Sequence, residues 1–312
     1  MEINNQNIIK KRPSKRSVDP YIPNNFLHER EVQSDGVVKR VNTIFLTNRE
    51  CPFKCTMCDL WRHTLDKTTP EGAIPQQIRY ALSRLPEAEV IKLYNSGNFF
   101  DGKAIPKSDY YEIADLISDA EHVVVENHPA LTGDSILEFK EMLHGTFEIA
   151  MGLETVHPVA MPKLNKQITK ELFAESVDIL RKWDISSRAF ILLNPPYITE
   201  ISENRKWSLE SVKFAFEAGV SACTIIPTRP GNGIMDDLLM SGEYVLPKLH
   251  ELETVFDSAL NLKIGRVFCD TWDLQIFSEC EKCFVYREER LTEMNLTQKI
   301  APPIRCSCMM DQ

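Results

Sequence analysis

Six short apolar runs, each followed by a polar or glycine-rich loop, restrict the fold of this sequence more than any other feature. Segments with helical periodicity separate the runs; in residues 172–183, for example, apolar side chains recur at steps of three or four. Strands that alternate with helices are typical of a parallel α/β architecture. The runs are Thr43–Leu46, Val90–Tyr94, His122–Val125, Phe147–Met151, Ala189–Leu193 and Ala222–Ile226.

These six strand–helix units predict a partial (βα)6 barrel of the TIM type over residues 41–262. In such a barrel the loops at the carboxyl ends of the strands converge on one face, where the chemistry takes place. A flat doubly wound sheet is the alternative that the same pattern allows. Residues 1–40 are expected to form a polar lead-in, and residues 263–312 a separate cysteine-rich extension.

Three cysteines lie directly after the first apolar run, in the sequence Cys51-Pro-Phe-Lys-Cys55-Thr-Met-Cys58. Three thiolates on one short loop can hold three irons of a cubane cluster and leave the fourth iron without a protein ligand. An open iron can bind a small chelating molecule, so the spacing predicts a reactive cluster. The alternatives are a disulfide, which suits a secreted protein with a signal peptide, and a zinc site with His63 as fourth ligand.

The overall charge limits the classes of partner. The 312 residues include 36 Lys and Arg and 45 Asp and Glu, a formal net charge of −9, which argues against a broadly basic nucleic-acid-binding surface. The N-terminus is polar and then basic and does not read as a signal peptide, and no apolar run approaches the roughly 18–20 residues that a bilayer requires. We therefore expect a cytoplasmic protein without membrane contact. The basic run from Lys10 to Arg16 is expected to be a solvated tail; an RNA- or phosphate-binding arm is the alternative.

Four further cysteines form two close pairs near the C-terminus, in C-x2-C and C-x-C spacing. Four sulfurs on two turns complete a tetrahedron, so this pattern predicts a metal site. Short turns favour zinc, and a second iron–sulfur cluster is the alternative. Cys269 is a candidate to replace one ligand or to bind substrate, and Cys223 is expected to be a buried apolar residue. The four are Cys280, Cys283, Cys306 and Cys308.

The first cysteine group and the strand before it resemble those of the radical S-adenosylmethionine (SAM) enzymes. In that superfamily the open iron is chelated by the amino and carboxylate groups of SAM, and the residue before the last cysteine, here Met57, lies near the adenine. The chain also resembles the branch with the archaeosine-synthesis enzymes and the radical SAM domain of the elongator acetyltransferase. The motifs that carry this similarity are Cys55-Thr-Met-Cys58, Tyr94-Asn-Ser-Gly-Asn-Phe-Phe-Asp101, Gly152-Leu-Glu-Thr155 and Leu192-Leu-Asn-Pro-Pro196.

The resemblance implies contacts for the parts of SAM. Asn95, Ser96 and Gly97 sit where the superfamily has a glycine-rich strand-end motif that binds the methionine amine, although an ordinary turn would look the same. Glu154 follows the fourth run, where a carboxylate can accept from both ribose hydroxyls; a helix N-terminus also favours an acid. Arg229, beyond the sixth run, is a candidate to hold the SAM carboxylate or the substrate through a planar two-point contact.

Four other residues are assigned from weaker signals. His128 is a candidate proton donor or substrate contact, or else a cap before Pro129. Asn194, after the fifth run, is a candidate substrate contact. Lys166, together with Asn165 before it, is a weaker candidate for phosphate or carboxylate contacts, and Arg188, at the amino end of its run, is expected to be structural.

The resemblance implies a reaction. A [4Fe-4S] cluster on Cys51, Cys55 and Cys58 would cleave SAM reductively to a 5′-deoxyadenosyl radical that abstracts hydrogen from substrate. A protein such as a flavodoxin or ferredoxin would supply the electron. The acidic chain, with no large appended nucleic-acid-binding domain, favours a small-molecule substrate over tRNA; the tRNA-modifying enzyme is one alternative. A non-catalytic binding protein with zinc at both cysteine groups is the other.

Overall fold

The computed structural model of the chain describes residues 3–309, and its strands form one eight-stranded sheet in which neighbours in sequence are neighbours in space. β1 is antiparallel to β2, and each pair from β2 to β8 is parallel. A doubly wound sheet reverses its strand order at a switch point, so the sequential order excludes that alternative. The strands are β1 (Asn25–Val32), β2 (Val38–Phe45), β3 (Val90–Tyr94), β4 (His122–Glu126), β5 (Thr146–Glu154), β6 (Ser186–Leu193), β7 (Ala222–Pro227) and β8 (Arg266–Cys269).

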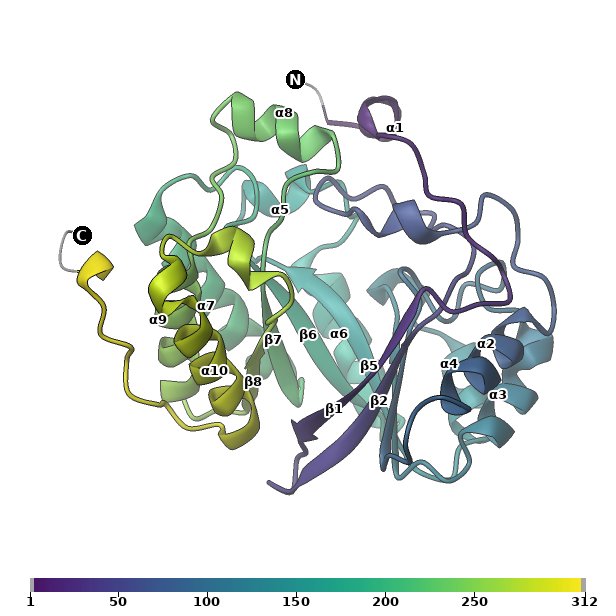
Figure 1. The fold of residues 1–312 in the computed structure, drawn as a ribbon. Helices are drawn as coiled ribbons and strands as arrows, with labels where there is room; N and C mark the ends of the chain where they lie inside the picture. Colours follow the sequence, from purple (N-terminus) through teal and green to yellow (C-terminus); the bar gives the residue numbers. More distant parts are fainter. Residues whose placement is uncertain (1–2, 310–312) are drawn as a thin grey trace.

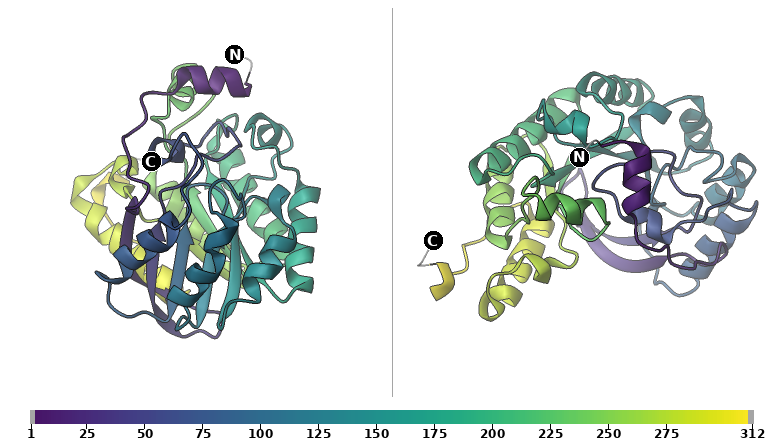
Figure 2. Two further views of the ribbon diagram at one scale, coloured as in Figure 1. Left: turned by 90° about the vertical axis from the view of Figure 1, so that its right-hand side faces the viewer. Right: turned by 90° about the horizontal axis from the view of Figure 1, so that it is seen from above.

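The sheet curls into a partial barrel with helices along its outer face (Figure 1), and the view from above in Figure 2 shows the curved layer of helices around it. The predicted fold class is confirmed, because β2 to β7 are the six predicted strands. The α-helices are α1 (Asn5–Lys11), α2 (Ala73–Leu82), α3 (Tyr110–Leu116), α4 (Asp134–Lys140), α5 (Ala160–Lys163), α6 (Lys170–Lys182), α7 (Ile201–Ala218), α8 (Ile234–Met240), α9 (Leu249–Asn261) and α10 (Glu281–Thr297). Single 3-10 turns are η1 (Leu60–His63), η2 (Lys107–Asp109), η3 (Pro129–Leu131), η4 (Leu274–Phe277) and η5 (Ser307–Met309).

Two strands of the sheet were not predicted. β1 lies inside the predicted lead-in and is only partly buried, and its charged residues Glu29, Arg30 and Glu31 hide the apolar alternation of a strand. β8 has four residues and lies inside the predicted extension, yet it pairs in parallel with β7. The sheet therefore includes residues on both sides of the predicted barrel segment.

Side chains alternate along each strand between the helix layer and the interior of the barrel. In β6, Ile191 and Leu193 belong to the main hydrophobic core with the helices. Phe190 points the other way and meets Tyr94 of β3 edge to face, with ring centroids 6.1 Å apart. Because β3 and β6 are not neighbours in the sheet, this contact crosses the interior.

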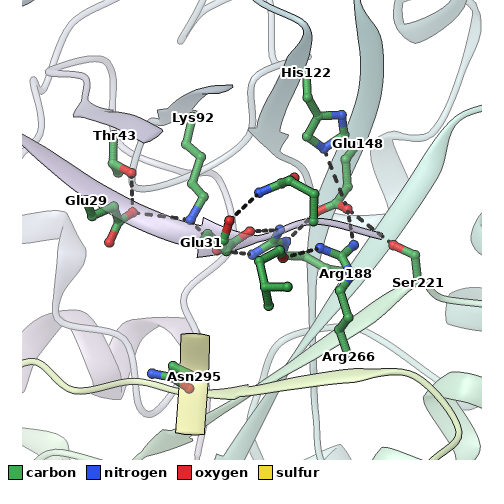
Figure 3. A network of polar contacts seen from close by, with 12 residues as sticks. Glu29, Glu31, Thr43, Lys92, His122, Glu148, Arg188, Ser221, Arg266 and Asn295 are labelled. Atoms are coloured by element: carbon green, nitrogen blue, oxygen red, sulfur yellow. Dashed lines mark hydrogen bonds and ion pairs between the residues drawn. The ribbon is translucent and has the colours of Figure 1, made fainter. Parts of the chain in front are cut away.

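A buried network of charges fills the amino end of the barrel (Figure 3). Arg188 forms an ion pair with Glu148 of β5 and a second one with Glu31 of β1, at 2.8 Å. Lys92 Nζ lies 2.5 Å from the other oxygen of Glu31, and Arg266 lies 3.6 Å from Glu148. Each buried charge thus has an opposite partner, which is the condition for holding charges out of water.

The end of β1 also reaches the opposite edge of the sheet. Val32 packs with Ala222 of β7 and Phe268 of β8, and its carbonyl accepts a hydrogen bond from Arg266, at 3.1 Å. β1 therefore closes the amino end of the barrel, and the structural role expected for Arg188 agrees with its position in this network. None of the helices in residues 3–309 has the length and apolar character to cross a membrane.

Candidate active site

The three early cysteines lie on the loop that leaves the carboxyl end of β2, and two other segments hold that loop. The Thr56 amide donates to the Leu164 carbonyl at 2.8 Å, and Asn165 Nδ2 donates to the Lys54 carbonyl at 2.7 Å. From the other side, Asn232 Nδ2 donates to the carbonyls of Thr56, at 2.7 Å, and Cys58, at 3.0 Å. The conformation of the cysteine loop is thus fixed by the segments after β5 and β7.

The three thiols are at least partly buried and influence one another. Burial raises the pKa of Cys51, and it raises that of Cys55 to about 11 in spite of the positive charge of Lys166 nearby. Burial also raises the pKa of Cys58, and the thiols of Cys55 and Cys51 add to that effect. Metal binding would therefore displace protons from this loop.

The spacing of these sulfurs differs from that of a single-ion site. Within the described part of the chain, they do not belong to any group of three or more side chains close enough to share one ion. Sulfurs that hold different irons of a cluster lie farther apart than sulfurs around one ion, so the loop suits a cluster better than the zinc alternative with His63.

The loop after β3 lies against the first cysteine. Asn98 Nδ2 is 3.2 Å from the Cys51 sulfur, and Gly97 allows the approach, since a Cβ there would lie 3.4 Å from the Cys51 Cβ. Asn95 is fully buried; its Nδ2 donates to Asn48 at 2.8 Å, but its Oδ1 has no partner among residues 3–309. A buried acceptor without a partner is uncommon and suits a ligand that donates to it.

Glu126 at the end of β4 is a site residue to which the sequence analysis gave no role. Burial raises its pKa to about 7, although the backbone amides of Gly97, Asn95 and Ser96 donate to the carboxylate and oppose the rise. Glu126 therefore holds the loop after β3 in place. Its position directly after the third apolar run was the only sequence signal for it.

Glu154 and Lys166 form a buried ion pair beside the cysteines, with Lys166 Nζ 2.6 Å from Glu154 Oε1. Burial lowers the pKa of Lys166, but the charges of Glu154 and Cys55 outweigh it and raise the pKa above its usual value. A Cβ on Gly152 would lie 2.1 Å from Glu154 Oε1, so glycine at this position makes room for the pair. Lys166, the weaker candidate in the sequence, thus interacts with both the Glu154 carboxylate and the thiols of the cysteine loop.

His128 is fully engaged within the protein. Its ring stacks on Phe53 with centroids 3.8 Å apart, and its Nδ1 accepts from the Ala130 amide at 3.1 Å. Nε2 then carries the proton and donates to the Lys166 carbonyl at 2.9 Å. Burial and the charge of Lys166 lower the pKa of His128 to about 4. The structure thus shows the capping contact of His128, and a substrate role stays a prediction.

The remaining predicted residues lie on other sides of the site. Arg229 forms an ion pair with Asp270 at 2.9 Å, and Asn194 Nδ2 points toward Glu251 of α9 at 3.4 Å. Met57 is half-buried and packs against a small apolar cluster of Ile8 and residues of α8. The structure gives no ligand contact for these three residues, and their roles stay predictions.

The N-terminal segment is folded across this face. Ile8 of α1 is 1% exposed, packs against α8 and lies in the same cluster as Met57. Lys11 pairs with Asp237 of α8 at 2.6 Å, and Arg12 pairs with Glu50, the residue before Cys51, at 2.8 Å. Figure 1 and the left view of Figure 2 show α1 beside α8 above the barrel. The basic run from Lys10 to Arg16 is therefore held against the protein by ion pairs and does not form the free tail that we expected, although Lys10 and Arg16 are exposed. Residues 5–16 form a strap over the cysteine loop.

The four C-terminal cysteines are brought together at the start of α10. Cys280 and Cys306 have sulfurs 3.9 Å apart, Cys283 and Cys308 have sulfurs 3.7 Å apart, and all four sulfurs lie within 4.8 Å of one another. A tetrahedron with metal–sulfur bonds of about 2.3 Å has edges of about 3.8 Å. Hydrogen bonding from the Cys308 amide lowers the pKa of Cys306 to about 6, which favours the thiolate that a metal needs.

Known proteins resemble the chain in sequence and in fold. An uncharacterized protein of Methanocaldococcus jannaschii is 26% identical over 303 residues, which cover 89% of this chain and 82% of that protein. No family model matches the sequence. Methylornithine synthase (PylB) superposes with a TM-score of 0.56 at 12% identity, over 82% of this chain and 68% of the synthase.

A second solved structure shares the fold. Elp3 of Methanocaldococcus infernus superposes with a TM-score of 0.52 at 12% identity, over 70% of this chain and 59% of the Elp3 chain. The chain thus spans less than two thirds of that protein. The chain has the fold of the radical SAM enzymes, so the resemblance seen in the sequence is confirmed at the level of the fold.

Proposed function

We propose that this protein is a radical SAM enzyme with a [4Fe-4S] cluster on Cys51, Cys55 and Cys58. The observation that carries the proposal is the cysteine loop: three largely buried thiols at the mouth of the barrel, near one another but not gathered around one ion. A cluster held by these three cysteines would supply, together with SAM, a 5′-deoxyadenosyl radical for hydrogen abstraction from the substrate. Everything else required of the protein is binding, orientation and exclusion of water.

The side chains around the loop fit SAM. Asn95 Oδ1, the buried acceptor without a partner in residues 3–309, suits the methionine amine. Lys166 suits the methionine carboxylate, because it is a buried cation next to Cys51 and Cys55. Glu154 then accepts from the ribose hydroxyls, as its strand-end position predicts. Met57 and Arg229 remain candidates for the adenine and for the substrate or the SAM carboxylate.

A small molecule is the substrate class that we favour. The charge network at the amino end leaves the carboxyl end of the barrel as the approach to the site. Much of the basic N-terminal run, the feature that pointed to RNA, is neutralised by Glu50, Asp66 and Asp237. The neutralisation of this run weighs against the tRNA alternative.

We further propose that Cys280, Cys283, Cys306 and Cys308 hold one zinc ion. The sulfur separations of 3.7 and 3.9 Å support a single tetrahedral ion over a second cluster. Such an ion would tie the start of α10 to the C-terminal segment, in the manner of structural zinc sites.

Anaerobic reconstitution tests the main proposal. Wild-type protein with iron and sulfide should bind close to four of each at the early cysteines, and with dithionite and SAM it should release 5′-deoxyadenosine. Cys55→Ala should lose the cluster and the product, whereas Cys223→Ala, a buried thiol outside the site, should keep both. A Cys55→Ala protein that retains the full cluster and still cleaves SAM would contradict the proposal, as would wild-type protein that binds only zinc.

A further inference from the structure

Three aromatic side chains on the inner face of the sheet are incompletely covered. Phe45, Tyr94 and Phe190 lie on β2, β3 and β6, and each is half-buried. The strand neighbours that face the helix layer, such as Leu93 and Ile191, are fully buried. Because successive side chains of a strand point to opposite faces, the three rings face the interior of the barrel. Large apolar rings that water still reaches are unfavourable by themselves and are typical of the lining of a ligand site.

These rings form a row with Trp272, which lies in the loop after β8. Phe45 and Tyr94 are partners in the register of β2 and β3, with ring centroids 6.0 Å apart. Tyr94 contacts Phe190 across the interior, and the ring centroid of Trp272 lies 5.2 Å from that of Phe45. Since β2 and β8 are not neighbours in the sheet, Trp272 spans the open side of the barrel. We call these four side chains the inner aromatic row.

The inner aromatic row lies between the charge network of the amino end and the candidate SAM site. Tyr94 comes two residues after Lys92, and Phe190 two residues after Arg188, so both rings lie one layer nearer the carboxyl end than the network shown in Figure 3. Asn95, which carries the buried acceptor without a partner in residues 3–309, directly follows Tyr94. A group that packs on the row is therefore next to the residues proposed for SAM.

The charges around the row are already balanced. Arg229 pairs with Asp270 at 2.9 Å and also donates to the Trp272 carbonyl, which holds the loop after β8. The Glu126 carboxylate accepts from backbone amides of the loop after β3. A charged group on the row would lose its water without gaining an unpaired partner, which is costly. In the network below the row, the cations Lys92, Arg188 and Arg266 pair with Glu29, Glu31 and Glu148.

We propose that the inner aromatic row binds a neutral planar ring of the substrate. This inference rests on the proposed function, because the ring belongs to the molecule from which that reaction abstracts hydrogen. Aromatic rings that pack edge to face or offset gain free energy beyond the area that they bury, whereas a saturated group gains the area alone. The row therefore selects a planar ring over an aliphatic chain, and the balanced charges select a neutral ring over a charged one.

Titration with indole, a neutral planar probe, tests the proposal. The protein is reconstituted with its cluster and saturated with SAM in the absence of reductant, so that the site of the adenine is occupied. In protein labelled with 15N in its tryptophan side chains, the Nε1–H signal of Trp272 should shift and saturate. The variant with both Phe190→Leu and Trp272→Leu keeps apolar side chains but loses two rings, and it should bind indole about fivefold more weakly or worse. Saturation-transfer NMR of the indole signals measures both affinities.

Controls separate the planar ring from other occupants. Tyr111→Leu removes an aromatic side chain of α3 that is 75% exposed, and it should keep the indole affinity of the wild type. Cyclohexylmethanol, which is saturated, and indole-2-carboxylate, which is charged, should each bind the wild type at least about fivefold more weakly than indole. Equal SAM affinity in the double variant and the wild type shows that the variant is folded and loaded. If the double variant does not fold, Trp272→Leu alone, at a side chain that is 43% exposed, should weaken indole binding about twofold or more.

Several results would overturn the proposal while leaving the proposed function intact. They are an unmoved Trp272 signal, a shift of Trp207 on the outer helix layer in its place, equal indole affinity in the ring variants and the wild type, and equal affinity for cyclohexylmethanol and indole. Displacement of indole by SAM would assign the row to the adenine and would also overturn it. If the wild type releases no 5′-deoxyadenosine from SAM and dithionite, the proposed function fails, and this inference fails with it even where indole binds.

Discussion

At the scale of single residues, the backbone is least ordinary where the strands end. Ser96, Glu154 and Asn194 have φ angles of 52°, 68° and 52°, a left-handed region that residues other than glycine rarely adopt. Each follows or ends a strand of the barrel on the carboxyl side. Such conformations cost on the order of 1–3 kcal/mol each and are commonly kept at functional sites.

Gly152→Ala should disturb the Glu154–Lys166 pair without touching the cysteines. The new Cβ would lie 2.1 Å from Glu154 Oε1 and 2.4 Å from Lys166 Nζ, so the pair must shift. We expect the free energy of unfolding to fall by about 1–3 kcal/mol, as for other overpacked sites, and SAM to bind at least tenfold more weakly. Urea unfolding and equilibrium binding of SAM to the reconstituted protein measure the two effects. Gly102→Ala, where the added Cβ meets no atom within 4 Å, is the control; equal SAM affinity in both variants would speak against the role of the pair.

Sequence and structure agree unevenly at this scale. The three cysteines and the loop after β3 were recognised from local motifs, and the structure brings them into contact through Asn98 and Cys51. The sequence analysis assigned no role to Glu126, because this carboxylate accepts hydrogen bonds from backbone amides of a different loop. Lys166 was assigned only as a weaker candidate, because its interaction with Cys55 joins segments that are distant in sequence and forms only in the folded chain.

At the scale of elements, the strap and β1 show most clearly why part of the fold could not be predicted from the sequence. Short apolar runs revealed β2 to β7, but β1 is charged because its side chains enter the network of Arg188 and Lys92. A run of apolar residues in the sequence indicates a segment that is buried among apolar neighbours. A strand whose side chains are buried in ion pairs has charged residues instead and shows no such run. The strap was read as a tail because its positive charges suggested solvent, whereas acids far along the chain neutralise several of them.

The C-terminal cysteine group should contain one zinc ion per chain. Elemental analysis of wild-type protein should show this ion, and Cys306→Ser should remove it, because three sulfurs leave the tetrahedron open. The cluster iron should be unchanged, since the two cysteine groups are separate in sequence and in ligands. Ser307→Ala, in the same turn, is the matched control and should keep the zinc. Sulfide and additional iron at this group, lost in Cys306→Ser, would indicate a second cluster instead.

At the scale of the whole molecule, the amino-end network couples both halves of the barrel through Glu31. Burial alone would raise the pKa of Glu31, but the charges of Arg188 and Lys92 and their hydrogen bonds outweigh it and lower the pKa to about 2. A carboxyl whose pKa is lowered by folding stabilises the fold above its unfolded pKa, near 4.5, and this stabilisation is lost as the pH falls toward 2. The network therefore contributes its full stability at neutral pH.

Glu31→Gln should destabilise the fold by about 3–5 kcal/mol at pH 7, because it leaves Arg188 and Lys92 short of a buried partner. The difference from wild type should shrink as the pH falls from about 4.5 toward 2, since the wild-type carboxyl is then protonated as well. Urea unfolding of the apoproteins between pH 7 and pH 3 measures this. Glu112→Gln, which removes an exposed pair with Arg79, should cost less than about 1 kcal/mol. A constant gap between Glu31→Gln and wild type across the whole range would contradict the assignment.

The strap also sets an order of events during synthesis. Its residues are made before the cysteine loop, yet they pack against Ile234 and Leu238, which are made nearly two hundred residues after that loop. At about 5–20 residues per second, the loop waits roughly 10–40 s before its clamp can close. Metal delivery during that interval would meet an open, mobile loop, and delivery afterwards a closed one. The three thiols are thus easiest to reach before residues 234–238 have been made.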